Sequence, residues 1–205
     1  MNNDKRRGLT LLIVAAALFT FVLTTHAGAP AFAQTGQKLY SDTKITLPAF
    51  DLPIPQDQSE KDYLGLSGKG TFKIGQIKAQ VVIIEVFSLY CPYCQVQAPL
   101  VSEVYQKIQE SPDLKEKIKM IGIAATNSAF EAKSFKETHH VPFPVFPDEE
   151  GDAAVALGVK YTPTFIGVRV DGKGSQEQFY WLPGVFKDST RFLEEILKTS
   201  GLEQR

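Results

Sequence analysis

The chain has 205 residues and a net charge of −1, so it is long enough for one ordinary domain with a complete core. Hydrophobic residues make up 43% and charged residues 22% of it, which excludes a wholly disordered chain. A nearly neutral, slightly acidic protein is a poor electrostatic match for nucleic acid. The chain has only two cysteines, which excludes a disulfide-dense scaffold.

Residues 1–33 have the pattern of a secretory signal peptide. A basic start at residues 5–7 precedes an apolar run over 9–23, and Ala31-Phe32-Ala33 places small residues at the −3 and −1 positions of a cleavage site. The alternative is a retained membrane anchor, although the run is short for a span, which needs about 20 apolar residues. In both cases we expect the rest of the chain to lie outside the cytoplasm, in the periplasm or a similar compartment where thiols can be oxidised.

Residues 34–74 are predicted to form an extended N-terminal lead-in. They are rich in Pro, Asp, Gln and Ser, which favours irregular structure, with one short edge strand over residues 44–47. We expect residues 75–205 to form the single folded domain.

Regular elements become clear in the middle of the chain. Residues 81–87 are a continuous, largely β-branched run, which is typical of a strand covered on both faces. The pattern after it predicts a helix over 92–110, a strand over 120–125, a helix over 128–140 with Phe130, Ala132 and Phe135 inward, a short extended segment over 143–146 and a short helix over 151–157.

The C-terminal part predicts a hairpin followed by a helix. Strands over 164–170 and 176–182 flank the turn signal Asp171-Gly172. Asp188 is placed to cap the last helix. We expect Phe192, Ile196 and Leu197 of this helix to face inward and Trp181 to pack beneath it. This order of elements predicts an α/β domain of three layers with a central mixed sheet.

Two cysteines stand where the buried strand gives way to a helix, in the segment Cys91-Pro92-Tyr93-Cys94. Sulfurs at positions i and i+3 of a first helical turn can close a small disulfide ring. The unpaired N–H groups and the dipole at a helix N-terminus favour a thiolate at Cys91, and Pro92 suits the first helical position. We therefore expect Cys91 to be the attacking thiolate and Cys94, one turn further in, the resolving cysteine.

Other interpretations of these cysteines have less support. Half of a zinc site would need a second C-x-x-C, and the adjacent His139 and His140 lack the usual ligand spacing. Gln95 stands where attachment of a c-type haem requires histidine. A purely structural disulfide of this size would restrain little chain entropy. The pattern favours redox chemistry by the cysteines themselves, with no cofactor and no metal.

The residues around the cysteines resemble the thioredoxin superfamily. The segment 81–99, VVIIEVFSLYCPYCQVQAP, is similar to that family's active-site strand, C-x-x-C and kinked helix, with Pro99 at the kink. Glu85 matches the buried acid beneath the resolving cysteine. Thr162-Pro163, followed by Thr-Phe, resembles the cis-proline turn that faces the disulfide. The resemblance implies a thioredoxin-like fold over most of residues 75–202.

Two branches of the superfamily are represented. The segment 142–174 resembles the TlpA/ResA branch and the related peroxiredoxins, which carry an extra helix and strand before the cis-proline. The sequence EVFSLYCPYC is closer to a DsbA kind of active site. The first resemblance implies a reductant, for instance in cytochrome c maturation, and the second an oxidant. The direction of exchange stays open.

The resemblance also implies roles for the supporting residues. Glu85, with a pKa raised by burial, would accept the proton of Cys94; the alternative is a strand-end carboxylate paired with Lys78. A cis Pro163 would expose the backbone of Thr162 to an incoming partner strand. Pro92 and Tyr93, with Tyr90, would line the docking rim, unless these tyrosines only serve packing.

These observations predict an extracytoplasmic thiol–disulfide oxidoreductase that exchanges disulfides with partner proteins through Cys91 and Cys94, with a membrane redox donor or acceptor. One alternative is a thiol peroxidase, but peroxiredoxins need Thr or Ser and Pro just before the reactive cysteine, and residues 87–90 do not supply them. The other is a copper-handling module, which would depend on His139 or His140.

Overall fold

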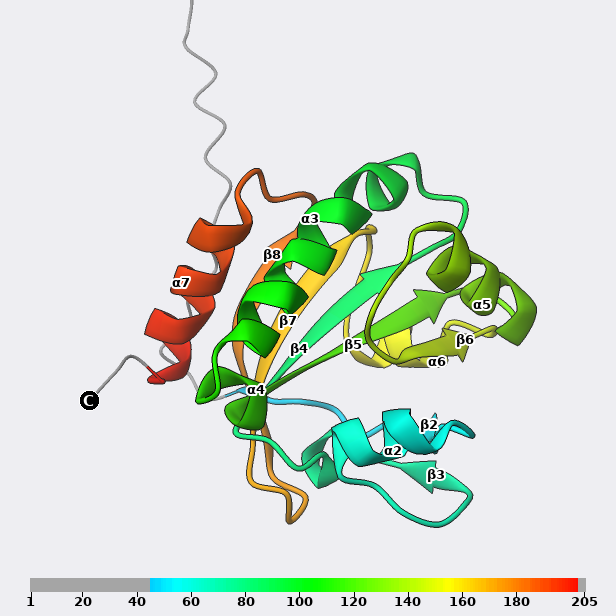
Figure 1. Ribbon diagram of the computed structural model, residues 1–205. Coiled ribbons are helices and arrows are strands. Elements are labelled where there is room, and N and C mark those ends of the chain that lie inside the picture. Colours follow the sequence, from blue (N-terminus) through cyan, green and yellow to red (C-terminus); the bar gives the residue numbers. More distant parts are fainter. Residues whose placement is uncertain (1–44, 203–205) are drawn as a thin grey trace, which may run out of the picture. The chain divides into compact units, whose positions relative to one another are not determined.

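The computed structural model describes residues 45–202, so the predicted signal peptide and the start of the lead-in lie outside the described range. Its centre is a six-stranded sheet in the order β1-β8-β7-β4-β5-β6 (Figure 1). The strands are β1 (Ile45–Thr46), β4 (Val81–Phe87), β5 (Ile118–Ala125), β6 (Val145–Asp148), β7 (Thr164–Val170) and β8 (Gln176–Pro183). Strands β4, β5 and β6 are parallel, whereas β7, β8 and β1 add antiparallel pairs, so the sheet is mixed as predicted.

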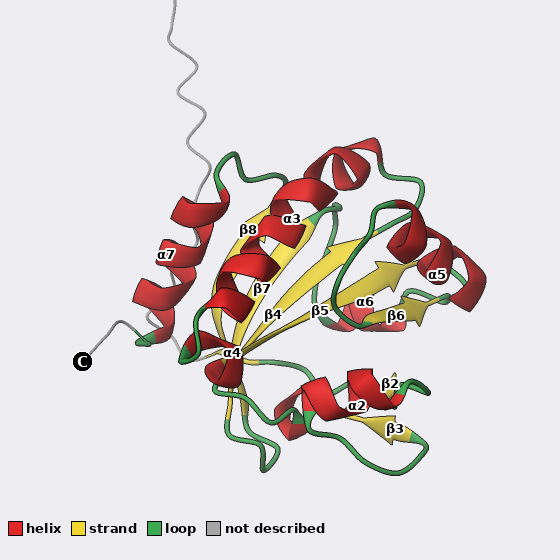
Figure 2. Ribbon diagram, viewed as in Figure 1, coloured by secondary structure: helices red, strands yellow, loops and turns green. Residues whose placement is uncertain are grey.

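Helices cover both faces of this sheet and make three layers (Figure 2). The helices are α2 (Gln58–Leu64), α3 (Pro92–Glu110), α4 (Leu114–Lys117), α5 (Ala129–Thr138), α6 (Asp152–Ala156) and α7 (Ser189–Ser200). Buried side chains of α3, α5 and α7 form one core with one face of the sheet, and those of α2 and α6 form a second core with the other. The predicted α/β class of thioredoxin-like architecture is confirmed.

Strand β4 is the central element that places the cysteines. All seven of its residues are buried, because β5 and β7 pair with its two edges and helices cover both faces. Alternate side chains of a strand point to opposite faces, and here Ile83 and Phe87 enter the first core while Val82 and Ile84 enter the second. The strand thus delivers the chain from the core to the N-terminus of α3.

The predicted insertion before Pro163 is present. Helix α5 and strand β6 lie between β5 and the turn that leads into β7, and β6 extends the parallel part of the sheet.

Ser128 caps α5 together with Glu131, and Asp188 caps α7 by accepting the N–H of Arg191 at 2.8 Å. Both helices therefore begin where the sequence predicts.

The lead-in contains a helix that was not predicted. It holds a two-stranded sheet of β2 (Leu52–Pro53) and β3 (Thr71–Phe72), with α2 between them in the chain. Asp57 caps α2 by accepting the N–H of Ser59 at 2.7 Å, and Gly65 ends it with a φ of 67°. The expected edge strand is present as β1, which pairs with β8.

Two expected core positions were wrong. Phe130 was expected inward but is 80% exposed, because only Ala132 and Phe135 of α5 turn toward the sheet. Trp181 was expected under the last helix but packs against the second core, and its neighbour Tyr180 packs under α7 instead. In residues 45–202 there is no helix with the length and apolar character needed to cross a bilayer.

Candidate active site

Cys91 is the N-cap residue of α3, where its sulfur replaces the oxygen of an ordinary cap. Its Sγ accepts the backbone N–H of Cys94 at 3.3 Å, and Pro92 occupies the first turn as predicted. On the other side, the Cys91 thiol donates to the backbone carbonyl of Thr162, also at 3.3 Å. The Thr162–Pro163 peptide bond is cis, as the resemblance implies. The fold thus brings together two predicted segments that lie 71 positions apart.

The surroundings of Cys91 favour its thiolate. Partial burial opposes ionisation, but hydrogen bonds from the Cys94 thiol, the Thr162 side chain and the backbone N–H groups of Cys94 and Tyr93 outweigh it, and the pKa of the Cys91 thiol is lowered. The side chain is only partly buried, so a substrate sulfur can reach it.

Cys94 has the opposite environment. Its side chain is completely buried in the first core. Burial raises the pKa of the Cys94 thiol, and the hydrogen bond that this thiol donates to Cys91 raises it further. One cysteine is therefore partly accessible and readily ionised, and the other is enclosed and holds its proton.

Glu85 is a carboxyl group inside the core. It occupies the same face of β4 as Ile83 and Phe87, which is the face that packs with Cys94. Its side chain is 2% exposed, its Oε1 atom has no hydrogen-bond partner, and burial raises the pKa of Glu85 to about 8. The interpretation as a strand-end carboxylate paired with Lys78 does not fit a side chain enclosed in this way.

Exposed apolar side chains surround the cysteines. Tyr90 and Tyr93 are each 69% exposed, Tyr161 beside the cis peptide is 74% exposed and Val185 in the β8–α7 loop is 45% exposed. That loop lies against the cis-proline turn, because the N–H of Gly184 donates to the carbonyl of Pro163 at 2.7 Å. Pro92 is also exposed, while Pro163 itself is buried.

Three polar residues near this site were not singled out by the sequence analysis. Asn127 is fully buried, and its Oδ1 accepts the N–H of Leu89 at 2.7 Å. Glu131 accepts the hydroxyl of Tyr90. Gln97 lies on the buried side of α3, 3% exposed, with its Nε2 unpartnered. Single polar residues carry no spacing signal, so only the folded contacts reveal them.

The histidines of the copper alternative lie at the end of α5. His139 follows the helix as its C-cap residue, and its ring contacts that of Phe135 at a centroid distance of 4.5 Å. Within the described part of the chain, no group of three or more His, Cys, Asp or Glu side chains is arranged to hold a metal ion.

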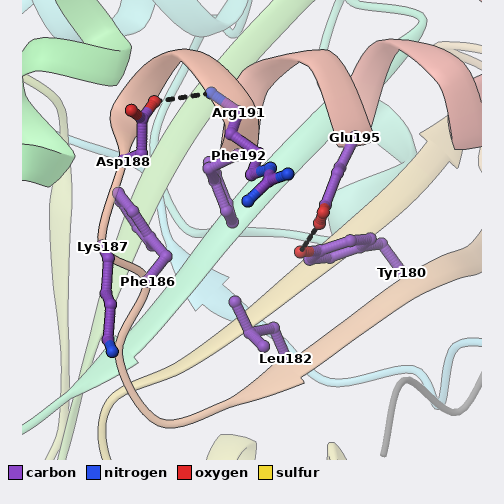
Figure 3. Close-up of a pocket in the computed structure, with 8 residues that line it drawn as sticks. All are labelled: Tyr180, Leu182, Phe186, Lys187, Asp188, Arg191, Phe192 and Glu195. Atoms are coloured by element: carbon purple, nitrogen blue, oxygen red, sulfur yellow. Dashed lines mark hydrogen bonds between the residues drawn. The ribbon is translucent and has the colours of Figure 1, made fainter. Parts of the chain in front are cut away.

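A cavity of about 230 Å³ lies between β8 and α7 (Figure 3). The rings of Tyr180, Phe186 and Phe192 line it together with charged side chains of α7, and the Tyr180 hydroxyl donates to Glu195 at 3.2 Å. No residue of the predicted site contributes to it. The catalytic candidates lie at the start of α3 and in the core beneath it, and not in this cavity.

The fold and the pair of cysteines define a thioredoxin-like protein with a C-x-x-C motif at a helix N-terminus, opposite a cis-proline. The chain belongs to the AhpC/TSA family, whose model matches residues 45–179. The expected resemblance to the TlpA/ResA branch agrees with the presence of a ResA protein among the relatives of the chain.

Curated relatives and solved structures agree with this family. Thiol-disulfide oxidoreductase ResA of Bacillus thuringiensis is 27% identical over 112 residues, which are 55% of this chain and 61% of ResA, so the match spans less than two thirds of the relative. A thiol:disulfide interchange protein of Chlorobium tepidum superposes with a TM-score of 0.54 at 18% identity, over 78% of this chain and 99% of that one. Peroxidoxin BcpB of Mycobacterium tuberculosis superposes with a TM-score of 0.53 at 17% sequence identity, over 80% of this chain and 98% of that one. These structures share the fold.

Proposed function

We propose that this protein is an extracytoplasmic thiol–disulfide oxidoreductase that exchanges disulfides with partner proteins. The observation that carries the proposal is the unequal pair of thiols: the pKa of Cys91 is lowered at an accessible helix N-terminus, and that of Cys94 is raised in the core. A nucleophile and a protected resolving thiol are the two parts that this exchange needs. The ResA relative, a thiol-disulfide oxidoreductase by name, supports the same chemistry.

The exchange begins with attack by the Cys91 thiolate on one sulfur of a partner disulfide. A mixed disulfide forms, and the partner's other sulfur leaves as a thiolate. Cys94 then gives its proton to the ionised form of Glu85 and attacks the Sγ of Cys91, which releases the second partner sulfur. The partner is reduced by one electron pair, and the Cys91–Cys94 pair is oxidised. The reverse sequence oxidises a partner dithiol.

Glu85 is suited to the proton transfer because of its burial. A carboxyl group with a pKa of about 8 is a much stronger base than an exposed one, and it lies on the face of β4 that packs with Cys94. A buried thiol of raised pKa needs such a base before it can attack.

Partner proteins would dock beside the cis-proline turn. The backbone carbonyl of Thr162 lies 3.3 Å from the Cys91 sulfur, so a partner strand that pairs with Thr162 would bring its own sulfur to Cys91. The exposed rings of Tyr90 and Tyr93 offer apolar contact at the same place. A membrane redox protein that recharges the pair is part of the proposal, as is export directed by residues 1–33.

Trapping of the mixed disulfide tests the function. In Cys94→Ser the second step is blocked, and partners should accumulate as covalent adducts of Cys91 that dithiothreitol releases. Cys91→Ser is the matched control and should trap none. Failure of the wild-type pair to form a disulfide in any glutathione buffer would refute the proposal, whereas the equilibrium potential in those buffers would separate reductant from oxidant duty. Fast consumption of peroxide would favour the thiol peroxidase alternative.

A further inference from the structure

The turn of residues 88–91, which leads into α3, is hydrogen-bonded by side chains of the segment that follows β5. Cys91 donates its N–H to the carbonyl of Ser88 at 3.1 Å, so Leu89 and Tyr90 are the two central residues of a hydrogen-bonded turn. Each of them has a partner at the start of α5. The N–H of Leu89 donates to Asn127 Oδ1 at 2.7 Å, and the hydroxyl of Tyr90 donates to Glu131.

Asn127 is fixed for this contact at both ends of its amide. Its Nδ2 donates to the carbonyl of Thr126 at 3.1 Å, and its side chain is completely buried. Thr126 has a φ of 54°, a left-handed conformation that is strained for a β-branched residue. Such strain persists where the surroundings determine the conformation, and here it turns the chain so that Asn127 meets Leu89.

Glu131 is anchored by its own helix and offers its free oxygen to Tyr90. Its Oε2 accepts the N–H of Ser128 at 2.8 Å and the Ser128 hydroxyl at 2.9 Å, which completes a capping box. Its Oε1 accepts the hydroxyl of Tyr90. The hydrogen bond from Tyr90 and those from Ser128 lower the pKa of Glu131, so it is a charged acceptor at neutral pH.

We propose that Asn127 and Glu131 are positioning residues that set the reactivity of Cys91 by fixing the turn of residues 88–91. The inference rests on the proposed function, because it matters only if Cys91 is the attacking thiol. The sulfur of Cys91 must stay within reach of the Cys94 N–H, and the backbone of the turn determines where that sulfur lies. A loosened turn weakens this hydrogen bond, which favours the thiolate.

The first test compares Asn127→Ala with Tyr63→Phe. Tyr63 is a matched control because its hydroxyl also accepts a backbone N–H at 2.7 Å, that of Met120, in the earlier part of β5. The readout is the pH midpoint of iodoacetamide alkylation of Cys91, measured by mass spectrometry. Asn127→Ala should raise the midpoint by about half a pH unit, which is roughly threefold less thiolate at pH values below it. Tyr63→Phe should lower stability and leave the midpoint unchanged.

The second test uses the other contact. Glu131→Ala should also raise the midpoint, whereas Ser128→Ala, which weakens the same capping box but keeps the contact with Tyr90, should not. If Asn127→Ala does not fold, the Glu131 and Ser128 pair decides. Wild-type midpoints in all folded variants would overturn the inference. Alkylation needs no partner protein, so this outcome is distinct from a wild-type protein that fails to exchange with glutathione, which would refute the proposed function instead.

Discussion

The backbone N–H of Cys94 donates a hydrogen bond of 3.3 Å to the sulfur of Cys91, and this bond favours the Cys91 thiolate. The first turn of α3 supplies the bond, because an N-cap side chain accepts an N–H group two or three residues further on. Ionisation of Cys91 strengthens this bond and makes a second negative charge on Cys94 less favourable. The two thiols are therefore expected to ionise in order.

Alkylation of the reduced protein tests that order. We predict that iodoacetamide modifies Cys91 first, with a pH midpoint below the ordinary value of about 8.5 for a free thiol, because its pKa is lowered. Cys94 should react only on unfolding, since it is fully buried and its pKa is raised. Peptide mapping by mass spectrometry across the pH range measures both. Faster labelling of Cys94 in the native protein would reverse the assigned roles.

Glu85 predicts a specific dependence of stability on pH. The pKa of Glu85 is about 8 in the folded protein and near 4.5 when the side chain is exposed in the unfolded protein. Between pH 4.5 and pH 8 the folded state therefore binds one proton more than the unfolded state. This stabilisation is complete below pH 4.5 and is lost as the pH rises through 8, with a slope of at most ~1.4 kcal/mol per pH unit. Glu85→Gln should flatten this part of the profile of unfolding free energy, measured by urea denaturation.

The control for Glu85 is a carboxylate at the surface. Glu149 is exposed, and Glu149→Gln should leave the pH profile parallel to that of the wild type. The same variants bear on the proton transfer: the resolution rate of the mixed disulfide should rise with pH toward 8 in the wild type and lose this dependence in Glu85→Gln. Parallel profiles for all three proteins would show that Glu85 neither titrates in this range nor serves as the base.

Tyr93 predicts a difference between protein and small-molecule substrates. Its ring is 69% exposed next to the reactive sulfur, so a docked partner would cover it. Tyr93→Ser should lower kcat/KM for a protein disulfide such as insulin about fivefold, roughly 1 kcal/mol of contact, and leave the rate with oxidised glutathione nearly unchanged. Val155→Ser, at a side chain of α6 that is 77% exposed, is the control. An equal loss with both substrates would mean that the ring affects Cys91 itself and not docking.

Local patterns were sufficient to predict the strand β4, the cysteines at the start of α3 and the elements around the cis-proline. The features that sequence analysis missed depend on contacts between distant segments. Helix α2 buries only Leu64, so it shows no apolar period. Asn127 and Glu131 are ordinary polar residues until the fold places them beside the turn of residues 88–91.

The misplaced aromatic residues have a similar cause. Alternation along β8 predicts that Tyr180 and Trp181 face opposite sides of the sheet, but it does not say which side carries α7. The pairing of β8 with β7 determines which side each residue faces. This pairing contains an irregularity between Gly167 and Val168 that shifts the register of the two strands. In α5, the inward face is narrower than the spacing suggests and leaves Phe130 in solvent.

The buried Phe192 and the exposed Phe130 give a prediction about the free energy of unfolding. Phe192 of α7 is 3% exposed and stacks on Phe186 with ring centroids 4.3 Å apart, while Phe165, next but one after Pro163, meets it edge-on at 5.4 Å. Phe192→Ala should lower the free energy of unfolding by about 3–5 kcal/mol, because it removes a large side chain and leaves a cavity in this cluster.

Phe130→Ala is the matched control for that substitution. It removes the same atoms from a side chain that is 80% exposed, so its effect on unfolding should stay within about 0.5 kcal/mol. Since Phe165 belongs to both the aromatic cluster and the strand after the cis-proline turn, Phe192→Ala should also slow exchange by Cys91 in the folded protein, whereas Phe130→Ala should not. Equal stability losses in the two variants, measured by urea denaturation, would contradict the assignment of Phe192 to the core and of Phe130 to the surface.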